Sequence, residues 1–261
     1  MIEEKVYGTH AVEEVLRAER RHVEKILLDA RRRGPEMRRL VTLATRRDIP
    51  ITTVASAHLR QLLGHDRHQG VVALVGPLTY YTLEQVMASR TQVTGPQTLL
   101  LLDGVTDVGN FAALIRSAVA FGVEVILLPR HRSVGLTPVV AKRSAGAVER
   151  VAVAQVANVA RALAALKQAG YWIYGADGQA DTAVAQVVWT QRVVLVVGAE
   201  GRGIRRLVRE QCDSLVRIPI RPGVNSLNVA VAGSIVLAYI WAQHHGSVGT
   251  CAVPEASRSL L

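Results

Sequence analysis

Cysteine is scarce in this chain, and long apolar runs are missing. The 261 residues include two cysteines, Cys212 and Cys251, which form no CxxC pair and have no accompanying histidine cluster. We therefore expect no disulfide and no metal site, and free thiols suit a reducing, cytoplasmic compartment. No uninterrupted apolar segment reaches the ~18–20 residues of a membrane-spanning helix, so we expect no membrane partner. The N-terminus is charged from Glu3 onward, unlike a secretory signal peptide.

Lysine is also scarce, although the chain is strongly basic. Four lysines contribute to a total of 31 basic residues, and the formal net charge is +10. Arginine makes bidentate contacts with phosphate and stacks on bases, so this composition favours a nucleic-acid partner. A GC-rich genome would also favour arginine, but it explains the excess of positive over negative charge less well.

Residues 1–76 are expected to form a small α/β unit that carries part of this charge. The apolar spacing predicts helices over 9–19, 35–48 and 56–64, with strands over 23–30, 49–55 and 70–76. Thr9 is a candidate N-cap, and Pro35 suits the first turn of its helix. The arginines within 30–34, with Arg38, Arg39, Arg46 and Arg47, are expected to form an RNA-binding surface. A solvated helix face is the alternative interpretation.

Residues 98–245 alternate short apolar strands with helices after a connector, 77–97, that has one possible short helix. Strands are predicted over 98–105, 124–129, 171–177, 192–198 and 214–220, and helices over 110–122, 159–170, 203–212 and from Val229 onward. Continuous apolar strands between helices are typical of a parallel sheet that is covered on both faces. The tail, 246–261, is small and polar, and we expect it to be disordered.

Three polar clusters follow predicted strands, where open parallel sheets bind their ligands. They are "DGVTDVGNFAALIRSA" (103–118), "VVGAEGRGI" (196–204) and "IPIRPGVNSLN" (218–228). The second cluster matches neither GxGxxG nor the P-loop pattern, so neither a Rossmann dinucleotide site nor a P-loop is supported.

Each cluster also has a purely structural interpretation. The glycines around Glu200 suit a tight turn, Asn110 suits an N-cap, and Arg116 can extend along its helix to water. Ser226 or Asn228 can cap the last helix. One cap needs one such side chain, however, and three polar residues within 225–228 exceed that need.

In this order, the three clusters resemble the motifs of the SpoU-type, or TrmH-like, RNA 2′-O-ribose methyltransferases. The segments "VYGTHAVEEVL" and "HDRHQGVVAL" resemble the ribosomal-protein-like RNA-binding domain of one branch. That branch methylates a guanosine ribose in the peptidyl-transferase region of large-subunit ribosomal RNA. The resemblance implies an α/β methyltransferase domain with a deep trefoil knot, a homodimer, and S-adenosylmethionine as cofactor.

The resemblance also assigns roles to single residues. It implies cofactor contacts at Gly198, Ile218 and Leu227, and catalytic-site roles for Asn110, Arg116, Glu200, Ser226 and Asn228. The chain departs from the family pattern at Val108, Ala112 and Ala230, which leaves this polar set intact. Because a guanidinium stays protonated, we expect Arg116 to clamp an RNA phosphate while that phosphate or Ser226 relays the proton.

Three alternative functions remain open at this point. The same chemistry on transfer RNA is one, although the N-terminal unit favours ribosomal RNA. An antibiotic-resistance methyltransferase of this fold is another. A non-enzymatic RNA-binding scaffold is the third, and the intact polar set argues against it.

Overall fold

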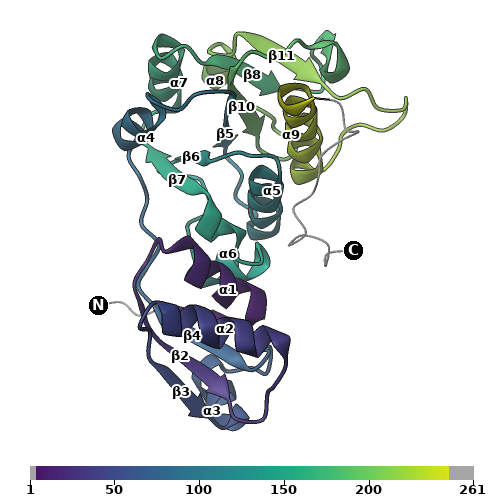
Figure 1. The fold of residues 1–261 in the computed structure, drawn as a ribbon. Coiled ribbons are helices and arrows are strands. Elements are labelled where there is room, and N and C mark those ends of the chain that lie inside the picture. Colours follow the sequence, from purple (N-terminus) through teal and green to yellow (C-terminus); the bar gives the residue numbers. More distant parts are fainter. Residues whose placement is uncertain (1–3, 247–261) are drawn as a thin grey trace.

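The computed structural model describes residues 4–246, which form two units stacked along one axis (Figure 1). The expected tail from residue 247 onward lies outside the described residues. Within residues 4–246 we find no helix whose length and apolar character would let it cross a membrane. Over the same residues, no cluster of three or more His, Cys, Asp or Glu side chains is suited to hold a metal ion.

The N-terminal unit is a four-stranded sheet with helices packed against it. Its elements are β1 (Glu4–Tyr7), α1 (Thr9–Ala18), β2 (Val23–Asp29), α2 (Pro35–Arg46), β3 (Ile51–Val54), α3 (Ser56–Leu63) and β4 (Val71–Val75). The strand order is β1-β4-β2-β3, and only β2 and β3 are parallel neighbours. One apolar cluster packs α1 and α2 on the sheet, and a smaller one packs α3 on the other face.

Two local predictions for this unit were incomplete. Helix α1 begins at Thr9, so Thr9 is not the N-cap, and the preceding Gly8 has a φ of 92°. The side chain of Gln69 takes over part of the capping, because its Oε1 accepts a hydrogen bond from the Thr9 backbone N–H at 3.1 Å. Strand β1 is absent from the predicted elements, because its sequence, EKVY, begins with two charged residues and has no apolar run.

The C-terminal unit contains the predicted parallel sheet. Its elements are β5 (Gln97–Asp103), α5 (Val108–Ala120), β6 (Val125–Pro129), α6 (Pro138–Arg143), η1 (Ala147–Arg150), β7 (Ala152–Val156), α7 (Val159–Gln168), β8 (Trp172–Ala176), β9 (Thr182–Ala183), η2 (Val184–Gln186), β10 (Arg192–Gly198), α8 (Arg206–Arg209), β11 (Ser214–Arg217) and α9 (Val229–His245). Seven strands in the order β7-β6-β5-β10-β8-β11-β9 are parallel throughout.

Both faces of this sheet are covered by helices, which explains its continuous apolar strands. In β5, Leu100 and Leu102 pack with α5 and α9, whereas Leu99 and Leu101 pack with α7 and the connector helix α4 (Leu83–Arg90). The connector is itself attached to the sheet. Tyr81 exchanges backbone hydrogen bonds with Val153 and Gln155 of β7 at 2.9 and 3.1 Å.

Helix α8 is much shorter than the predicted helix over 203–212, and α6, β9 and η2 were not predicted. Gly201 and Gly203 have φ angles of 77° and 63°, which keep the chain out of a helix. The Arg205 backbone N–H donates to the carboxylate of Asp103 at 2.9 Å, so it does not form a helical hydrogen bond. The helix therefore begins only at Arg206.

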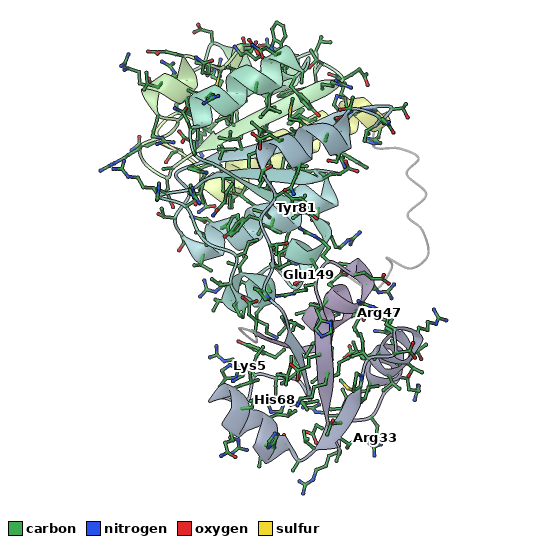
Figure 2. The ribbon with its side chains drawn as sticks, turned by 90° about the vertical axis from the view of Figure 1, so that its left-hand side faces the viewer. Lys5, Arg33, Arg47, His68, Tyr81 and Glu149 are labelled. Atoms are coloured by element: carbon green, nitrogen blue, oxygen red, sulfur yellow. The ribbon has the colours of Figure 1, made fainter. Side chains whose placement is uncertain are left out.

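A buried ion pair joins the two units. Arg21 binds Glu149 of η1, whose side chain has no exposed surface, and it also donates to Glu4 at 2.9 Å. Arg20 donates to the backbone carbonyls of Val148 and Val151. Figure 2 shows Glu149 where the two units meet. The relative position of the units is thus fixed in part by these charged contacts.

Candidate functional site

A cleft opens at the carboxyl ends of β8, β10 and β11, where an open parallel sheet places its ligands. One part of the cleft has a volume of about 600 Å³, and an adjoining part measures about 230 Å³. The two parts share lining residues at 176–179 and 225–227, so they form one continuous hollow. The outer part is walled by the loop after β10, and the inner part by Ile218 and Ile220.

Gly198, the last residue of β10, sits where two backbone segments cross. A Cβ atom on Gly198 would lie 2.1 Å from the carbonyl carbon of Gly203. Ala199 and Gly203 close the loop with two backbone hydrogen bonds, 3.0 and 2.8 Å long. The glycine is required by this tight loop, and the same loop forms the wall of the cleft. The structural and functional interpretations of "GAEGRG" are therefore compatible.

The loop after β10 is held from behind by Asp103, the last residue of β5. Asp103 is fully buried and lies beside Gly198 in the strand register. Its carboxylate accepts hydrogen bonds from the backbone N–H and the Nε of Arg205, at 2.9 and 2.8 Å. A buried carboxylate with a charged partner and a backbone donor fixes the loop in one position.

A chain of hydrogen bonds links all three sequence clusters. The Asn110 side-chain amide donates to Glu200 Oε2 at 3.1 Å, and the Asn228 amide donates to Asn110 Oδ1 at 2.9 Å. The Asn228 Oδ1 in turn accepts from the backbone N–H groups of Ala230 and Val231. Residues that are far apart in sequence thus form one polar network at the edge of the cleft.

Capping accounts for only part of this network. Asp107 is the N-cap of α5, and its carboxylate accepts from the Asn110 backbone N–H at 2.7 Å. The side chain of Asn110 is therefore free for Glu200 and Asn228. Asn228 is the N-cap of α9 and uses its side-chain oxygen for this purpose. Its amide group donates to Asn110 instead.

The remaining predicted residues occupy different positions. Ser226 and Leu227 line both parts of the cleft, and Ile218 lines the inner part. Arg116 is exposed on α5, and within residues 4–246 its guanidinium has no carboxylate within 4.0 Å. The structure therefore does not connect Arg116 to the hydrogen-bonded network, although Arg116 and Asn110 lie on the same helix, α5.

The predicted basic surface of the N-terminal unit divides in two. Arg38, Arg39 and Arg46 line a groove of about 430 Å³ that also includes Arg17 of α1. Arg47 instead donates to the carbonyl oxygen of Leu16 at 2.7 Å, where it satisfies the end of α1. Figure 2 shows Arg33 and Arg47 on this unit. Arg47 is thus partly structural, while the groove keeps four arginine side chains together.

Sequence reasoning missed Asp103, Arg205 and the segment 176–179. Asp103 did carry a signal, because an acidic residue ends an otherwise apolar, buried strand. Arg205 was one of several arginines in a predicted helix, and nothing distinguished it. The segment after β8 enters the cleft only because β8 lies between β10 and β11, which the strand order determines.

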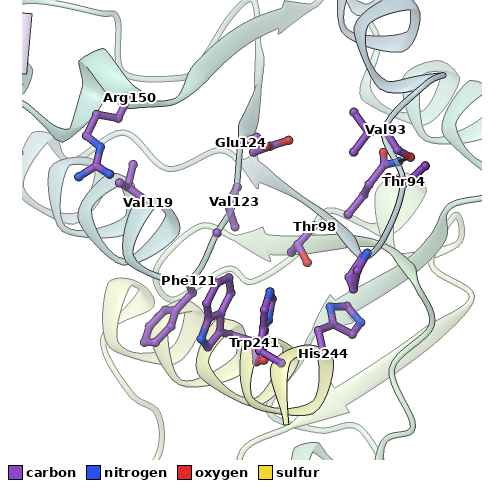
Figure 3. A pocket seen from close by; sticks show the side chains of 14 residues that line it. Val93, Thr94, Thr98, Val119, Phe121, Val123, Glu124, Arg150, Trp241 and His244 are labelled. Atoms are coloured by element: carbon purple, nitrogen blue, oxygen red, sulfur yellow. Dashed lines mark hydrogen bonds between the residues drawn. The ribbon is translucent and has the colours of Figure 1, made fainter. Parts of the chain in front are cut away.

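A second hollow, of about 360 Å³, lies at the amino ends of the strands of the same sheet. Figure 3 shows it between the starts of β5 and β6 and the end of α9, with Phe121, Trp241 and His244 on one side. His244 is occupied by a hydrogen bond with the Thr190 carbonyl at 2.8 Å. None of the three sequence clusters reaches this hollow, so the cleft beside Gly198 is the candidate site.

Many enzymes that bind small molecules have an all-parallel α/β domain with polar side chains at the carboxyl ends of its strands. The C-terminal unit belongs to this structural class. Residues 97–238 match the model of the SpoU rRNA Methylase family, and residues 5–81 match that of RNA 2′-O ribose methyltransferase substrate binding. The chain belongs to the SpoU methylase family.

Relatives match along nearly the whole chain. The chain is similar to the 23S rRNA (guanosine-2′-O-)-methyltransferase RlmB of Pseudomonas syringae pv. tomato, with 40% identity covering 90% of this chain and 93% of the relative. RlmB of Ralstonia nicotianae is 39% identical over 88% of this chain and 92% of its own length. The SpoU methyltransferase AviRb from Streptomyces viridochromogenes, solved with AdoMet, is 25% identical, with a TM-score of 0.75 over 92% of this chain and 90% of that chain.

Proposed function

We propose that this protein transfers a methyl group from S-adenosylmethionine to the ribose 2′-oxygen of a guanosine in large-subunit, 23S ribosomal RNA. The observation that carries the proposal is the Glu200–Asn110–Asn228 network, which brings the three family motifs together beside the cleft. The 40% identity to RlmB across nine-tenths of the chain supports the guanosine and the ribosomal substrate.

The cleft has the size and lining that the cofactor needs. Leu227, Ile218 and Ile220 provide an apolar wall suited to adenine, and the loop after Gly198 presents backbone groups. Asp177 is also in the lining and offers a carboxylate to a hydroxyl or ammonium group. In this assignment Gly198, Ile218 and Leu227 contact the cofactor, which supplies an already electrophilic methyl group when bound.

The remaining task for the protein is to align the 2′-oxygen and to remove its proton. Asn110, Asn228 and Glu200 hold one another in fixed orientations, so the first motif and the start of α9 present a pre-organised surface to the ribose. Ser226 lines both parts of the cleft and can accept a hydrogen bond from the 2′-hydroxyl.

Arg116 is assigned to the RNA and not to the network. Its exposed guanidinium, which has no carboxylate within 4.0 Å among residues 4–246, suits bidentate binding of the phosphate next to the target ribose. Such a contact fixes the 2′-hydroxyl and stabilises negative charge as it develops on the oxygen. The 2′-hydroxyl proton then passes to that phosphate, or Ser226 accepts it while releasing its own hydroxyl proton to water.

We assign RNA binding to residues 1–76, connection to 77–97 and methyl transfer to 98–245. The arginine groove between α1 and α2 supports the first assignment, because Arg17, Arg38, Arg39 and Arg46 converge there. The ribosomal-protein-like character of this unit is part of the same proposal. A cytoplasmic location follows from a ribosomal RNA substrate.

The trefoil knot and the homodimer also belong to the proposal. Asn228 starts α9 beside Asn110, which itself contacts the loop after β10, as expected where a C-terminal segment passes close to that loop. Helix α9 is apolar on nearly all sides and leaves Val231 and Tyr239 exposed. An apolar helix face of this kind suits burial against a second copy of the chain.

The test is methyl transfer from labelled S-adenosylmethionine to separate pools of ribosomal and transfer RNA. We expect label in 23S RNA, at a guanosine whose ribose resists alkaline cleavage on its 3′ side. Label confined to transfer RNA would overturn the substrate, and methylation of a base would overturn the chemistry. A resistance-type role would appear as a change in antibiotic sensitivity on expression.

A further inference from the structure

Helix α6 lies between the two units and carries two adjacent cations that point to different sides. Lys142 faces the N-terminal unit, where its Nζ lies 5.0 Å from the centre of the Tyr7 ring. Arg143 faces α5, where its Nη1 is 3.4 Å from the position that a Cβ of Gly109 would occupy. Among residues 4–246, neither cation has a carboxylate within 4.0 Å.

The surroundings of Lys142 are unusually confined for a lysine. A Cβ on Gly8 would lie 2.3 Å from the lysine Nζ and 2.7 Å from Gln69 Oε1, so both side-chain ends pack directly on the Gly8 backbone. Burial also lowers the pKa of Lys142. A lysine normally extends its ammonium group to water, so a half-buried, unpaired one is held at an energetic disadvantage in the protein alone.

Aromatic rings and an amide side chain lie close to this lysine. We name Tyr7, Gly8, His65, Gln69 and Lys142 the junction cluster. The Tyr7 and His65 rings lie 4.9 Å apart. Gln69 is exposed and uses its oxygen on Thr9, and within the described part of the chain its amide N–H groups have no hydrogen-bond partner. Cations, flat rings and amide donors are the groups with which proteins hold single-stranded RNA.

The junction cluster is connected to the reaction site by α6 itself. Arg143 extends the positive charge from Lys142 to the start of α5, where Asp107 and Asn110 are located. Arg116 follows on the same helix α5. The ion pair of Arg21 and Glu149 keeps the two units in a fixed relation, so the cluster and the reaction site hold a constant spacing.

We propose that the junction cluster binds the RNA strand between the N-terminal unit and the target ribose, with Lys142 on a backbone phosphate and the Gln69 amide on the same nucleotide. The proposal rests on the proposed function for the identity of the RNA. Because Lys142 acts through the position of the strand, it is a positioning residue, and its loss weakens RNA binding without changing the methyl-transfer step.

The experiment compares Lys142→Met with Lys167→Met, which removes the same charge from α7. Lys167 is paired with Asp213 at 2.8 Å, so it is already neutralised by the protein. The probe is an in vitro transcript of a large-subunit RNA fragment. For Lys142→Met we expect RNA affinity and KM to worsen about tenfold, as for one charge-assisted phosphate contact, with kcat and cofactor affinity unchanged. The slope of the logarithm of RNA affinity against the logarithm of salt concentration should become less steep by about one.

Two further variants separate RNA contact from structural support. Lys142→Arg keeps the charge and should restore most of the affinity. Gln69→Glu keeps an oxygen for Thr9 but replaces the amide donor by a negative charge, so RNA affinity should fall while the melting temperature holds. Wild-type affinity and salt slope in Lys142→Met and Gln69→Glu would overturn the proposal. Absence of methyl transfer by the unaltered protein would instead overturn the proposed function, because binding is measured separately.

Discussion

Asn228 donates a hydrogen bond from its side-chain amide to Asn110 Oδ1 at 2.9 Å, across 118 positions of sequence. The same Asn228 uses its oxygen to cap α9. One side chain therefore stabilises a helix and also fixes the orientation of a residue that contacts Glu200. The two roles can be separated by substitution, because they use different atoms.

Replacement of Asn228 by Asp retains the capping oxygen and removes the amide donor. We expect the melting temperature to stay close to that of the unaltered protein, while kcat falls about 10- to 100-fold because Asn110 loses its orientation. Asn228→Ala removes both roles and should also cost about 1 kcal/mol of stability. Thermal unfolding and steady-state kinetics check both variants. Unchanged kcat in Asn228→Asp would show that the Asn110 contact is dispensable.

Arg116 should be needed for turnover but not for cofactor binding. We expect Arg116→Ala to lower kcat by about 100-fold or more, because the charge that holds the phosphate is lost. Arg116→Lys should recover only part of the rate, since an ammonium does not make the bidentate contact. Calorimetry should give unchanged cofactor affinity. Arg206→Ala on α8, which removes another exposed arginine, is the control. Turnover of Arg116→Ala at the control rate would remove Arg116 from the mechanism.

Much of the fold was predictable because the apolar strands are continuous. β5 is buried along its whole length and β10 from Val193 onward, and a short run such as "TLLLL" is typical of a strand at the centre of a covered sheet. The same reasoning failed for α8. Its length depends on Asp103, which lies 102 positions away from Arg205, and no local pattern reveals that contact.

The candidate site was predictable as a set of residues but not as a network. The surplus of polar side chains at 225–228 indicated a role beyond capping, and Asn228 does carry a second contact. Which cluster would contact which could not be deduced, because Asn110 meets Glu200 only through the pairing of β5 with β10. The roles of Gly198, Ile218 and Leu227 toward the cofactor remain predictions.

Gly198→Ala should damage the cleft wall. Its Cβ would lie within 2.1–2.3 Å of backbone atoms of Gly203 and Ile204, which cannot rotate away as a side chain would. We expect a loss of about 2 kcal/mol of stability together with weaker cofactor binding. Gly178→Ala, also in the cleft, is the matched control because its Cβ would meet no atom within 4 Å. Equal stability and affinity in the two variants would contradict the backbone crossing at Gly198.

Replacement of Glu149 should lower the free energy of unfolding of the protein. Its side chain is fully buried against Arg21, so Glu149→Ala leaves a buried guanidinium with Glu4 and the Gly76 carbonyl as its partners. We expect a loss of about 3 kcal/mol in the free energy of unfolding, as for other broken buried pairs. Glu210→Ala breaks an exposed pair with Arg206 and should cost less than about 1 kcal/mol. Denaturant unfolding distinguishes the two, and similar losses would show that the junction pair is no stronger than a surface one.

Cys212 should react slowly with alkylating reagents in the folded protein. Burial raises the pKa of its thiol to about 12, so only about one molecule in 10⁴ carries the thiolate at pH 8. In a Cys251→Ser background, we expect alkylation to accelerate about tenfold per pH unit between 7 and 10 without levelling off. An ordinary thiol would level off above pH ~9. Because the pKa is raised by folding, the stability that Cys212 contributes is complete below its ordinary pKa and declines as the pH rises from there toward 12.

Mass spectrometry gives the alkylation rate of Cys212, and denaturation should abolish the protection. A plateau near pH 9 in the folded protein would show that the thiol is not shielded as the structure places it, partly buried against the cluster that packs α7 and α8 on the sheet.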